Sequence, residues 1–409
     1  MNKSQNLKKV VVVGGGFGGI AAIQKLKKTG VNCDITLVTK GDVFEYYPGL
    51  YKLVTGALAI EVSVPYSKIK GLKKVHIEKG VFASVDPARQ VISLEGGKEI
   101  PYDYLVLALG SETNYFNISG LPDLSLSFKS VKEAFRLKRH FCELFGTAMT
   151  LSPKDAVSKL HIVIVGGGPS GVELAGDLTH YLRGLAEGFN VDPSLVTIDL
   201  IEAANRVLPT LPEKVSQRAD KRLRTLGVNI YTNRYVTGQD INEVTMAGMN
   251  FQSNTVIWTA GTRINSAYRK VPVAELDSKN KIVVDEYLAL PKDNHIFVIG
   301  DGASTKYSGL AQTAIHNGKY LGKHLGRIIE GKSSEPYKPA PVSLVIPIGD
   351  YFALFVHGKR LFKGLAPWLL RSVVDFKYFF SIVPFWHVIN IVRQGAKYRR
   401  SRTYCPIDE

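Results

Sequence analysis

The stretch VVVVGGGFGGIAAIQKLKK, residues 10–28, decides the fold. Its four valines predict a buried strand, its glycines a tight turn, and the apolar residues after them a helix. Gly14, Gly16 and Gly19 match G-x-G-x-x-G, in which the first glycine makes the turn and the second lets a pyrophosphate approach the backbone. The third glycine allows close helix–strand packing, and the helix N-terminus offers free N–H groups to the phosphates. The stretch therefore predicts a dinucleotide-binding turn.

The same pattern recurs in IVIVGGGPSGVELAGDL, residues 162–178. The second copy has its glycines at the same spacing: Gly166, Gly168 and Gly171. Each copy is followed, at almost the same distance, by an apolar strand that ends in a small-residue turn, at Gly110 in the first copy and at Gly261 in the second. A matched internal period predicts two related nucleotide-binding units.

Composition is that of a globular protein with a basic surface. The 409 residues are 45% hydrophobic and 22% charged, and 52 Lys+Arg against 36 Asp+Glu give a net charge of +16. This length suits two or three domains, and the charge favours anionic partners. Cys33, Cys142 and Cys405 lie far apart with no C-x-x-C spacing, so we expect neither a disulfide framework nor a metal site, and a reducing compartment. The N-terminal residues leave no room for a signal peptide before the first strand.

The residue after the second strand of each unit bears on the nucleotide ribose. In such units this residue is usually an acid that accepts hydrogen bonds from ribose hydroxyls. The first unit has Thr39 followed by Lys40, so its hydroxyl replaces the acid. The second unit has Glu202, which favours NADH over NADPH, although Arg206 nearby could contact a 2′-phosphate.

Two further segments belong with the first unit. The aromatic segment FEYYPGLYKLVTG, residues 44–56, is unlike a plain surface loop. HIFVIGDG, residues 295–302, reads as a buried strand followed by Asp301, which fits the second flavin fingerprint of two-dinucleotide reductases, and a helix is expected from Leu310. The residues expected to line the first nucleotide, FAD, are Gly14, Gly16, Phe17, Gly18, Gly19, Thr39, Lys40, Gly110, Asp301 and Ala311. Those expected to line the second, NADH, are Gly166, Gly168, Gly171, Glu202 and Gly261.

The C-terminal stretch 361–402 is dense in aromatic and basic residues. Its longest uncharged run, residues 378–392, is broken by Pro384 and is too short to span a bilayer. Apolar bulk with tryptophans and flanking cations is typical of a helix that lies in a lipid headgroup layer. The alternative is a helix pair that packs on the protein's own core or makes a homodimer; nucleic acid is the weaker reading. The residues concerned are Trp368, Phe376, Phe379, Phe380, Phe385, Trp386, Arg371, Lys377, Arg393, Lys397, Arg399, Arg400 and Arg402.

Together these motifs resemble the type II NADH:quinone oxidoreductases, the single-subunit NADH dehydrogenases that pump no protons. The segments that carry the resemblance are GGGFGG, FEYYPGLYKLVTG, GGGPSGVELAGDL, IFVIGD, AQTAIHNG and the basic aromatic tail. The expected fold is α/β, with two Rossmann-like domains, the second inserted in the first, and a membrane-associating C-terminal region. The expected boundaries are 1–120 with 285–335 for FAD, 121–284 for NADH and 336–409 for the membrane surface.

The resemblance implies hydride transfer from NADH to FAD and electron transfer to a membrane quinone, at the cytoplasmic face of the cell membrane. It places Glu173 near the nicotinamide and flavin, and Gln312 in the quinone pocket. The family's second glutamine falls at His316, which could hydrogen-bond a quinone carbonyl. Each also has a structural reading: Glu173 as an acid in the first turn of its helix, Gln312 as a cap, and His316 as an ordinary helix histidine.

Three alternatives remain open. A sulfide:quinone oxidoreductase shares the fold but needs paired redox cysteines and has no use for Glu202. A ferredoxin or rubredoxin reductase would leave the apolar tail unexplained. A flavin-dependent redox sensor would bind a partner in an NADH-dependent way rather than turn over a quinone.

Overall fold

A six-stranded sheet forms the first nucleotide-binding unit. The computed structural model describes residues 7–246, 248–401 and 405, with residues 396–401 described by backbone alone. The strand order is β19-β20-β9-β1-β2-β5, and neighbours run parallel except for β19 and β20. The bounds are β1 Lys8–Val13, β2 Cys33–Thr39, β5 His76–Lys79, β9 Tyr104–Leu107, β19 Ala289–Leu290 and β20 Asp293–Val298.

Helices pack on one face of this sheet, and a small antiparallel sheet packs on the other. Side chains alternate along a strand, so Val10 and Val12 of β1 pack with the helices on one face. These helices are α1 (Phe17–Thr29) and α8 (Ala311–Ile329), which lie against each other. The other valines of β1 pack with a three-stranded antiparallel sheet. Its strands are β6 Phe82–Asp86, β7 Val91–Leu94 and β8 Glu99–Pro101.

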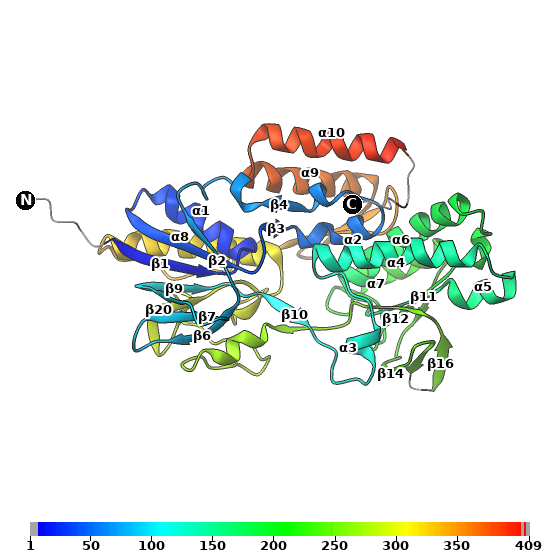
Figure 1. The fold of residues 1–409 in the computed structure, drawn as a ribbon, viewed down its shortest axis with the longest axis horizontal. Coiled ribbons are helices and arrows are strands. Elements are labelled where there is room, and N and C mark those ends of the chain that lie inside the picture. The colour runs from blue at the N-terminus through cyan, green and yellow to red at the C-terminus, as the bar shows by residue number, and fades with distance from the viewer. Residues whose placement is uncertain (1–6, 247, 402–404, 406–409) are drawn as a thin grey trace, which may run out of the picture.

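A second, four-stranded parallel sheet has the order β13-β12-β11-β17. Val165, at the end of β11, pairs with Ile201 on one side and Trp258 on the other. The long helices α4, α6 and α7 and the short helix α5 lie around this sheet (Figure 1). The bounds are β11 His161–Val165, β12 Thr197–Ile201, β13 Val228–Tyr231, β17 Thr255–Trp258, α4 Val131–Ala148, α5 Pro153–Lys159, α6 Pro169–Gly188 and α7 Glu213–Thr225.

Two short strands connect the sheets. Strand β10 (Ser111–Thr113) follows β9, and β18 (Thr262–Ile264) follows β17, and the two pair antiparallel. The chain therefore leaves the first sheet by one strand and returns along its partner to complete that sheet with β19 and β20. This arrangement confirms the expected α/β fold with the second nucleotide-binding unit inserted in the first. A small sheet of β14 Val236–Gln239, β15 Glu243–Met246 and β16 Met249–Gln252 flanks the second unit.

The C-terminal region is an antiparallel sheet followed by two helices. The helices lie along the edge of the molecule, above α2 (Leu50–Val54) in the view of Figure 1. Phe379, Ile382, Val388 and Ile391 join the core of the first unit, whereas Ile346 and Leu354 join that of the second. The bounds are β21 Ser343–Pro347, β22 Ala353–His357, β23 Arg360–Gly364, α9 Leu365–Ile382 and α10 Phe385–Ser401.

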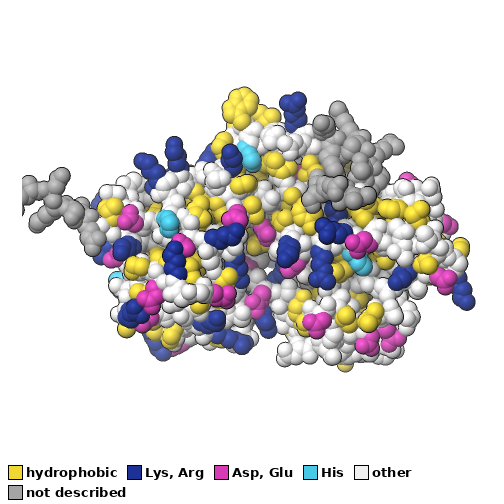
Figure 2. All heavy atoms as spheres, in the orientation of Figure 1, with side chains coloured by type: hydrophobic (Ala, Val, Ile, Leu, Met, Phe, Trp, Pro, Cys, Tyr) yellow, Lys and Arg dark blue, Asp and Glu magenta, His cyan; other side chains and the backbone are white. Residues whose placement is uncertain are grey.

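An apolar face of α9 and α10 points away from the protein. Figure 2 shows hydrophobic side chains above the start of α10, with cations beside them. Trp386 is 77% exposed. The described helices include none that is long and apolar enough to cross a membrane. The exposed apolar residues are Leu365, Leu369, Val373, Val374, Phe376, Phe380, Phe385, Trp386, Ile389 and Val392.

Parts of the expected tail surface are instead internal. Phe379 is 5% exposed and Arg371 is 8% exposed, because both lie on the side of α9 that faces the protein. Lys377 and Arg393 are exposed, as expected. The side chains of Lys397, Arg399 and Arg400, and all of Arg402, lie outside the described residues.

The expectation of no disulfide was wrong. Cys142 of α4 and Cys405 are bonded across 263 residues of sequence, with their Cα atoms 5.7 Å apart. Neither residue has a neighbouring cysteine, so spacing could not indicate the pair. Cys33 is free and half-buried.

Candidate active site

In the first glycine turn, the space beside the middle glycine is empty, whereas backbone atoms pack tightly against the first and third glycines. A Cβ added to Gly14 would lie 2.2 Å from the Ala108 carbonyl oxygen, and one added to Gly19 would lie 2.0 Å from the Gly14 oxygen. A Cβ added to Gly16 would meet no protein atom within 4 Å. Gly16 is the N-cap of α1 and no side chain caps this helix. Space and free N–H groups therefore coincide where a phosphate is expected.

The second turn repeats this geometry. A Cβ on Gly171 would lie 1.9 Å from the Gly166 oxygen, whereas one on Gly168 would meet nothing within 4 Å. Gly168 is the N-cap of α6, again with no capping side chain. Both turns thus fit the pyrophosphate of a dinucleotide by the same means, and close packing explains the outer two glycines of each motif.

Thr39 is less available than its position predicted. Its side chain is 7% exposed, and its Oγ1 lies 3.2 Å from the Tyr66 hydroxyl and 3.4 Å from the Gly41 oxygen. The Tyr66 hydroxyl in turn lies 3.2 Å from the Gly15 carbonyl oxygen, which accepts its hydrogen bond. Thr39 therefore supports the glycine turn indirectly, through its hydrogen bond with Tyr66. Lys40 is exposed beside it.

Glu202 occupies the expected place at the end of β12. Its carboxylate accepts hydrogen bonds from the backbone N–H groups of Gly167 and Ala204, each at 2.7 Å. The Arg206 guanidinium donates hydrogen bonds to the Leu211 and Pro209 carbonyl oxygens, both at 2.9 Å, and to Ser216. The remaining lone pairs of the Glu202 carboxylate can accept hydrogen bonds from ribose hydroxyls, and the Arg206 guanidinium is already hydrogen-bonded within the protein. Both features favour a ribose that carries both hydroxyls over one that carries a 2′-phosphate.

Replacing Glu202 with glutamine will therefore weaken the choice of NADH. The neutral amide keeps the size of the side chain but no longer repels a 2′-phosphate or accepts two ribose bonds. We expect the ratio of kcat/KM for NADH to that for NADPH to fall by about tenfold or more, which corresponds to roughly 1.4 kcal/mol. Glu213→Gln, an exposed acid at the start of α7, is the matched control. An unchanged ratio in Glu202→Gln would contradict this role.

Asp301 follows β20 at the same edge of the first sheet as the glycine turn. Its carboxylate accepts a 2.7 Å hydrogen bond from the Ser111 hydroxyl. The turn at Gly110 has positive φ and open space beside it, whereas a Cβ at Gly261 would meet the ring of Phe116. Phe17 is 7% exposed and packs among aromatic side chains, so only its backbone can serve a cofactor. Gly18 packs beside Ile299.

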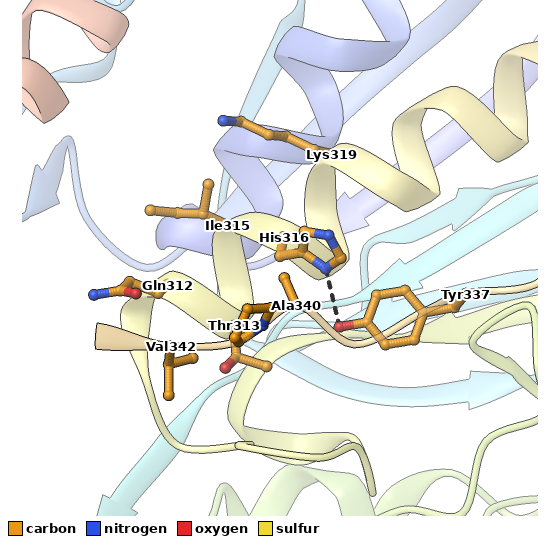
Figure 3. Close-up of a pocket in the computed structure, with 9 residues that line it drawn as sticks. Gln312, Thr313, Ile315, His316, Lys319, Tyr337, Ala340 and Val342 are labelled. Carbon is orange, nitrogen blue, oxygen red and sulfur yellow. Dashed lines mark hydrogen bonds between the residues drawn. The ribbon is translucent and has the colours of Figure 1, made fainter. Parts of the chain in front are cut away.

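Gln312 and His316 line one pocket of about 240 Å³. The pocket lies between α8, which begins at Ala311, and the chain before β21 (Figure 3). The His316 ring lies 3.1 Å from the Tyr337 hydroxyl, and burial followed by the nearby Lys319 lowers the pKa of this histidine, which favours a neutral ring. The Gln312 amide instead binds the backbone of Ser343, donating to its oxygen at 2.6 Å and accepting from its N–H at 3.3 Å.

Glu173 belongs to a largely buried charge cluster that the sequence did not predict. We define this cluster as Lys52 of α2 (Leu50–Val54), Glu173 and Asp177 of α6, and Arg371 and Asp375 of α9. Arg371 lies 3.6 Å from Glu173 and 3.0 Å from Asp375, and Lys52 lies 2.8 Å from Asp375. Three separate parts of the chain meet in this cluster.

The cluster is linked to the pocket through β21. Arg371 donates to the Val345 oxygen at 3.2 Å, and Gln312 holds Ser343 two residues earlier on the same strand. The Tyr46 hydroxyl, from the aromatic segment, donates to Asp375 at 2.6 Å. The structure thus brings Gln312 and His316 together directly, and joins Glu173 to them through a strand and an arginine.

Burial sets the protonation of this cluster. It raises the pKa of Glu173 to about 7, against the opposing attraction of Arg371, and raises that of Asp177 to about 7 against Lys52. Asp375 is also buried, but Lys52 and Arg371 outweigh burial and lower its pKa. With two cations and three acids, the cluster reaches neutrality when one of the raised acids holds a proton.

This protonation makes stability fall as pH rises. Glu173 and Asp177 titrate near pH 4 when unfolded, so between about pH 4 and 7 the folded protein binds more protons than the unfolded chain. The free energy of unfolding should therefore decrease through that window and level off above it. Glu173→Gln, which is neutral throughout, should gain about 1 kcal/mol or more over the wild type between pH 5 and pH 8 in urea unfolding.

Glu187→Gln, an exposed acid on the same helix, is the control for that measurement and should show no such gain. If the difference between Glu173→Gln and the wild type does not change with pH, Glu173 ionises as easily in the folded protein as in water.

Comparison with known proteins gives the class. The profile of the pyridine nucleotide-disulphide oxidoreductases matches residues 8–318, and the chain belongs to this family. The type II NADH:quinone oxidoreductase Ndh of Mycobacterium tuberculosis is 29% identical, and the match covers 90% of this chain and 84% of that protein. The type II NADH:quinone oxidoreductase of Haemophilus influenzae is also 29% identical, with 85% and 86% covered.

Solved structures agree on the fold. NDH2 from Plasmodium falciparum, in complex with NADH, has a TM-score of 0.87 at 17% identity, covering 98% of this chain and 100% of that one. The sulfide:quinone oxidoreductase of Aquifex aeolicus has a TM-score of 0.78 at 17% identity, covering 94% and 92%. The sulfide enzyme is the more distant of the two.

Proposed function

We propose that this protein is a type II NADH:quinone oxidoreductase, a flavoprotein that passes electrons from NADH to a membrane quinone without pumping protons. FAD, when bound, accepts a hydride from NADH and gives two electrons to the quinone. The observation that carries the proposal is the pair of matched glycine turns, each open at its middle glycine, in a chain whose curated relatives are named for this activity.

Each unit has a separate task. The first, residues 1–120 with 285–335, holds FAD at the turn around Gly16, with Asp301 at the same sheet edge. The second, residues 121–284, holds NADH at the turn around Gly168, and Glu202 accepts hydrogen bonds from its adenosine ribose. Separate turns would let each nucleotide bind by its own pyrophosphate, FAD beside Gly16 and NADH beside Gly168.

The quinone reaches the pocket lined by Gln312 and His316. Its apolar walls, Ile315, Pro341 and Val342, suit a quinone ring, and the neutral His316 ring can hydrogen-bond a carbonyl oxygen. Gln312 acts by fixing β21 beside the pocket. Burial raises the pKa of Glu173 to about 7, so this side chain exchanges a proton near neutral pH in the charge cluster that Arg371 links to β21.

The C-terminal helices support the proposal that the protein binds a membrane surface. Their exposed apolar face, with Lys377 and Arg393 on its borders, suits the interface of an anionic lipid layer. The basic chain, with a net charge of +16, adds attraction to anionic headgroups. We place the protein on the cytoplasmic face of the cell membrane; the same apolar face would serve a homodimer only in the absence of lipid.

Anaerobic stopped-flow absorbance tests the function directly. Mixing the yellow protein with NADH should bleach the flavin, and a water-soluble quinone should restore it. NADPH should bleach it more slowly. Bleaching by sulfide alone would favour the sulfide enzyme, and NADH bleaching without reoxidation by quinone would favour a redox sensor.

The cysteines give sulfide chemistry little support. The bonded pair joins α4 of the second unit to Cys405, and neither cysteine lies on a strand or turn that forms the first nucleotide site. Glu202 and the second glycine turn have a use only if a nicotinamide nucleotide binds.

A further inference from the structure

The ammonium of Lys129 is buried without a hydrogen-bond partner among the described residues. Lys129 lies on the segment that enters the second unit, just before α4. A buried ammonium without a partner is costly, since it has given up its water and gained nothing in return. A flexible lysine could avoid this cost by turning outward, so its buried position indicates a partner that the described part of the chain does not supply.

The backbone around Lys129 is held firmly. Its N–H donates to the Glu133 carboxylate at 2.7 Å, and the same carboxylate accepts from the Ser127 hydroxyl at 2.8 Å. Ser130 caps α4 by accepting from the Glu133 N–H. The next residue, Val131, donates its N–H to Glu45 of the first unit at 3.3 Å. The side chain therefore starts from a fixed point at the contact between the units.

The charges that act on this ammonium include Asp301, the acid expected at the FAD site. Asp301 raises the pKa of Lys129, as do Glu133 and Glu112, against the larger lowering effect of burial and a smaller one from Lys281. None of the three acids hydrogen-bonds the ammonium. The Asp301 carboxylate accepts a hydrogen bond from the Ser111 hydroxyl, and the Glu112 carboxylate accepts one from Arg263 at 2.8 Å. Burial raises the pKa of the Tyr47 hydroxyl, and Glu45, Asp301 and Glu133 are among the groups that add to this rise.

We propose that Lys129 is a ligand of FAD: its ammonium hydrogen-bonds an acceptor atom of the cofactor beside Asp301 and stabilises the negatively charged reduced flavin. This inference rests on the proposed function only in placing FAD in the first unit. It makes a residue of the segment that leads into the NADH unit part of the FAD site, so the cofactor itself fastens the two units together.

The test compares Lys129→Met with Lys132→Met. Lys132 is exposed in the first turn of α4, so its loss removes an equal charge from the same helix end. We expect Lys129→Met to bind FAD at least about tenfold more weakly in equilibrium dialysis. We also expect a midpoint potential about 30 mV more negative, which is a tenfold lower preference for the reduced form of a two-electron couple. Lys129→Arg should restore much of the potential, and Lys132→Met should match the wild type.

Thermal unfolding with and without FAD separates this role from a structural one. Loss of a cofactor ligand reduces the rise in Tm that FAD gives, whereas loss of a structural residue lowers both Tm values equally. Equal lowering, or wild-type FAD affinity and potential in Lys129→Met, would overturn the assignment. A wild-type protein that binds no FAD would overturn the proposed function as well, so the two failures are distinguishable.

Discussion

Replacing Leu369, Val373, Phe385 and Trp386 together with glutamine should release the protein from anionic vesicles. These side chains are 51%, 59%, 55% and 77% exposed on the outer face of α9 and α10. Each is worth roughly 1.5–3 kcal/mol when buried in an apolar layer. Even partial insertion of four gives about 3 kcal/mol, so partitioning in a vesicle sedimentation assay should weaken at least about hundredfold. Reduction of the flavin by NADH should be unchanged.

The matched control replaces Met149, Tyr235 and Ile241 with glutamine. They are 54%, 58% and 73% exposed but lie on the second unit, away from α9 and α10. Lipid binding of this variant should equal that of the wild type. Point variants are preferable to truncation because α9 and α10 also supply buried core residues. If the quadruple variant still sediments with vesicles, the apolar face serves a different partner.

Gly168→Ala should separate NADH binding from FAD binding. The backbone at Gly168 has φ −71°, which alanine adopts without strain, and the added Cβ meets no protein atom. The fold is thus preserved, and the methyl group occupies only the space meant for the pyrophosphate. We expect the KM for NADH to rise at least about tenfold while the protein remains yellow after gel filtration.

Gly16→Ala is the reciprocal variant, because its φ of −80° is equally tolerant and its Cβ equally free. It should lose FAD during gel filtration, with affinity at least about tenfold lower. If Gly168→Ala lost the yellow colour and Gly16→Ala kept it, the two units would have been assigned the wrong way round.

The features that depend on consecutive residues could be predicted from the sequence. Both glycine turns, the strands before them and the acid at Glu202 follow from a few consecutive residues, and the structure places all of them as expected. The insertion of the second unit followed from the order of those motifs. The ribose role of Thr39 was weakened by Tyr66, which is 27 residues away and gave no local signal.

Features built from distant segments could not be predicted in this way. The contact of Tyr46 with Asp375 joins residues 329 apart, and the disulfide joins residues 263 apart. One signal was present: Arg371 and Asp375 are spaced i, i+4 within a largely apolar helix, which is the spacing of an ion pair. It was read as part of a cationic surface because the direction of the helix face depends on tertiary contacts.

The packing of the C-terminal helices also bears on how the protein is made. α9 and α10 leave the ribosome after every other described helix and strand, yet their Phe379 and Ile391 complete a core that begins with Val10. Contacts between such distant segments form slowly, and until then the matching apolar surface of the first unit stays uncovered. Chaperone binding to the nascent chain should therefore persist until α9 and α10 have emerged.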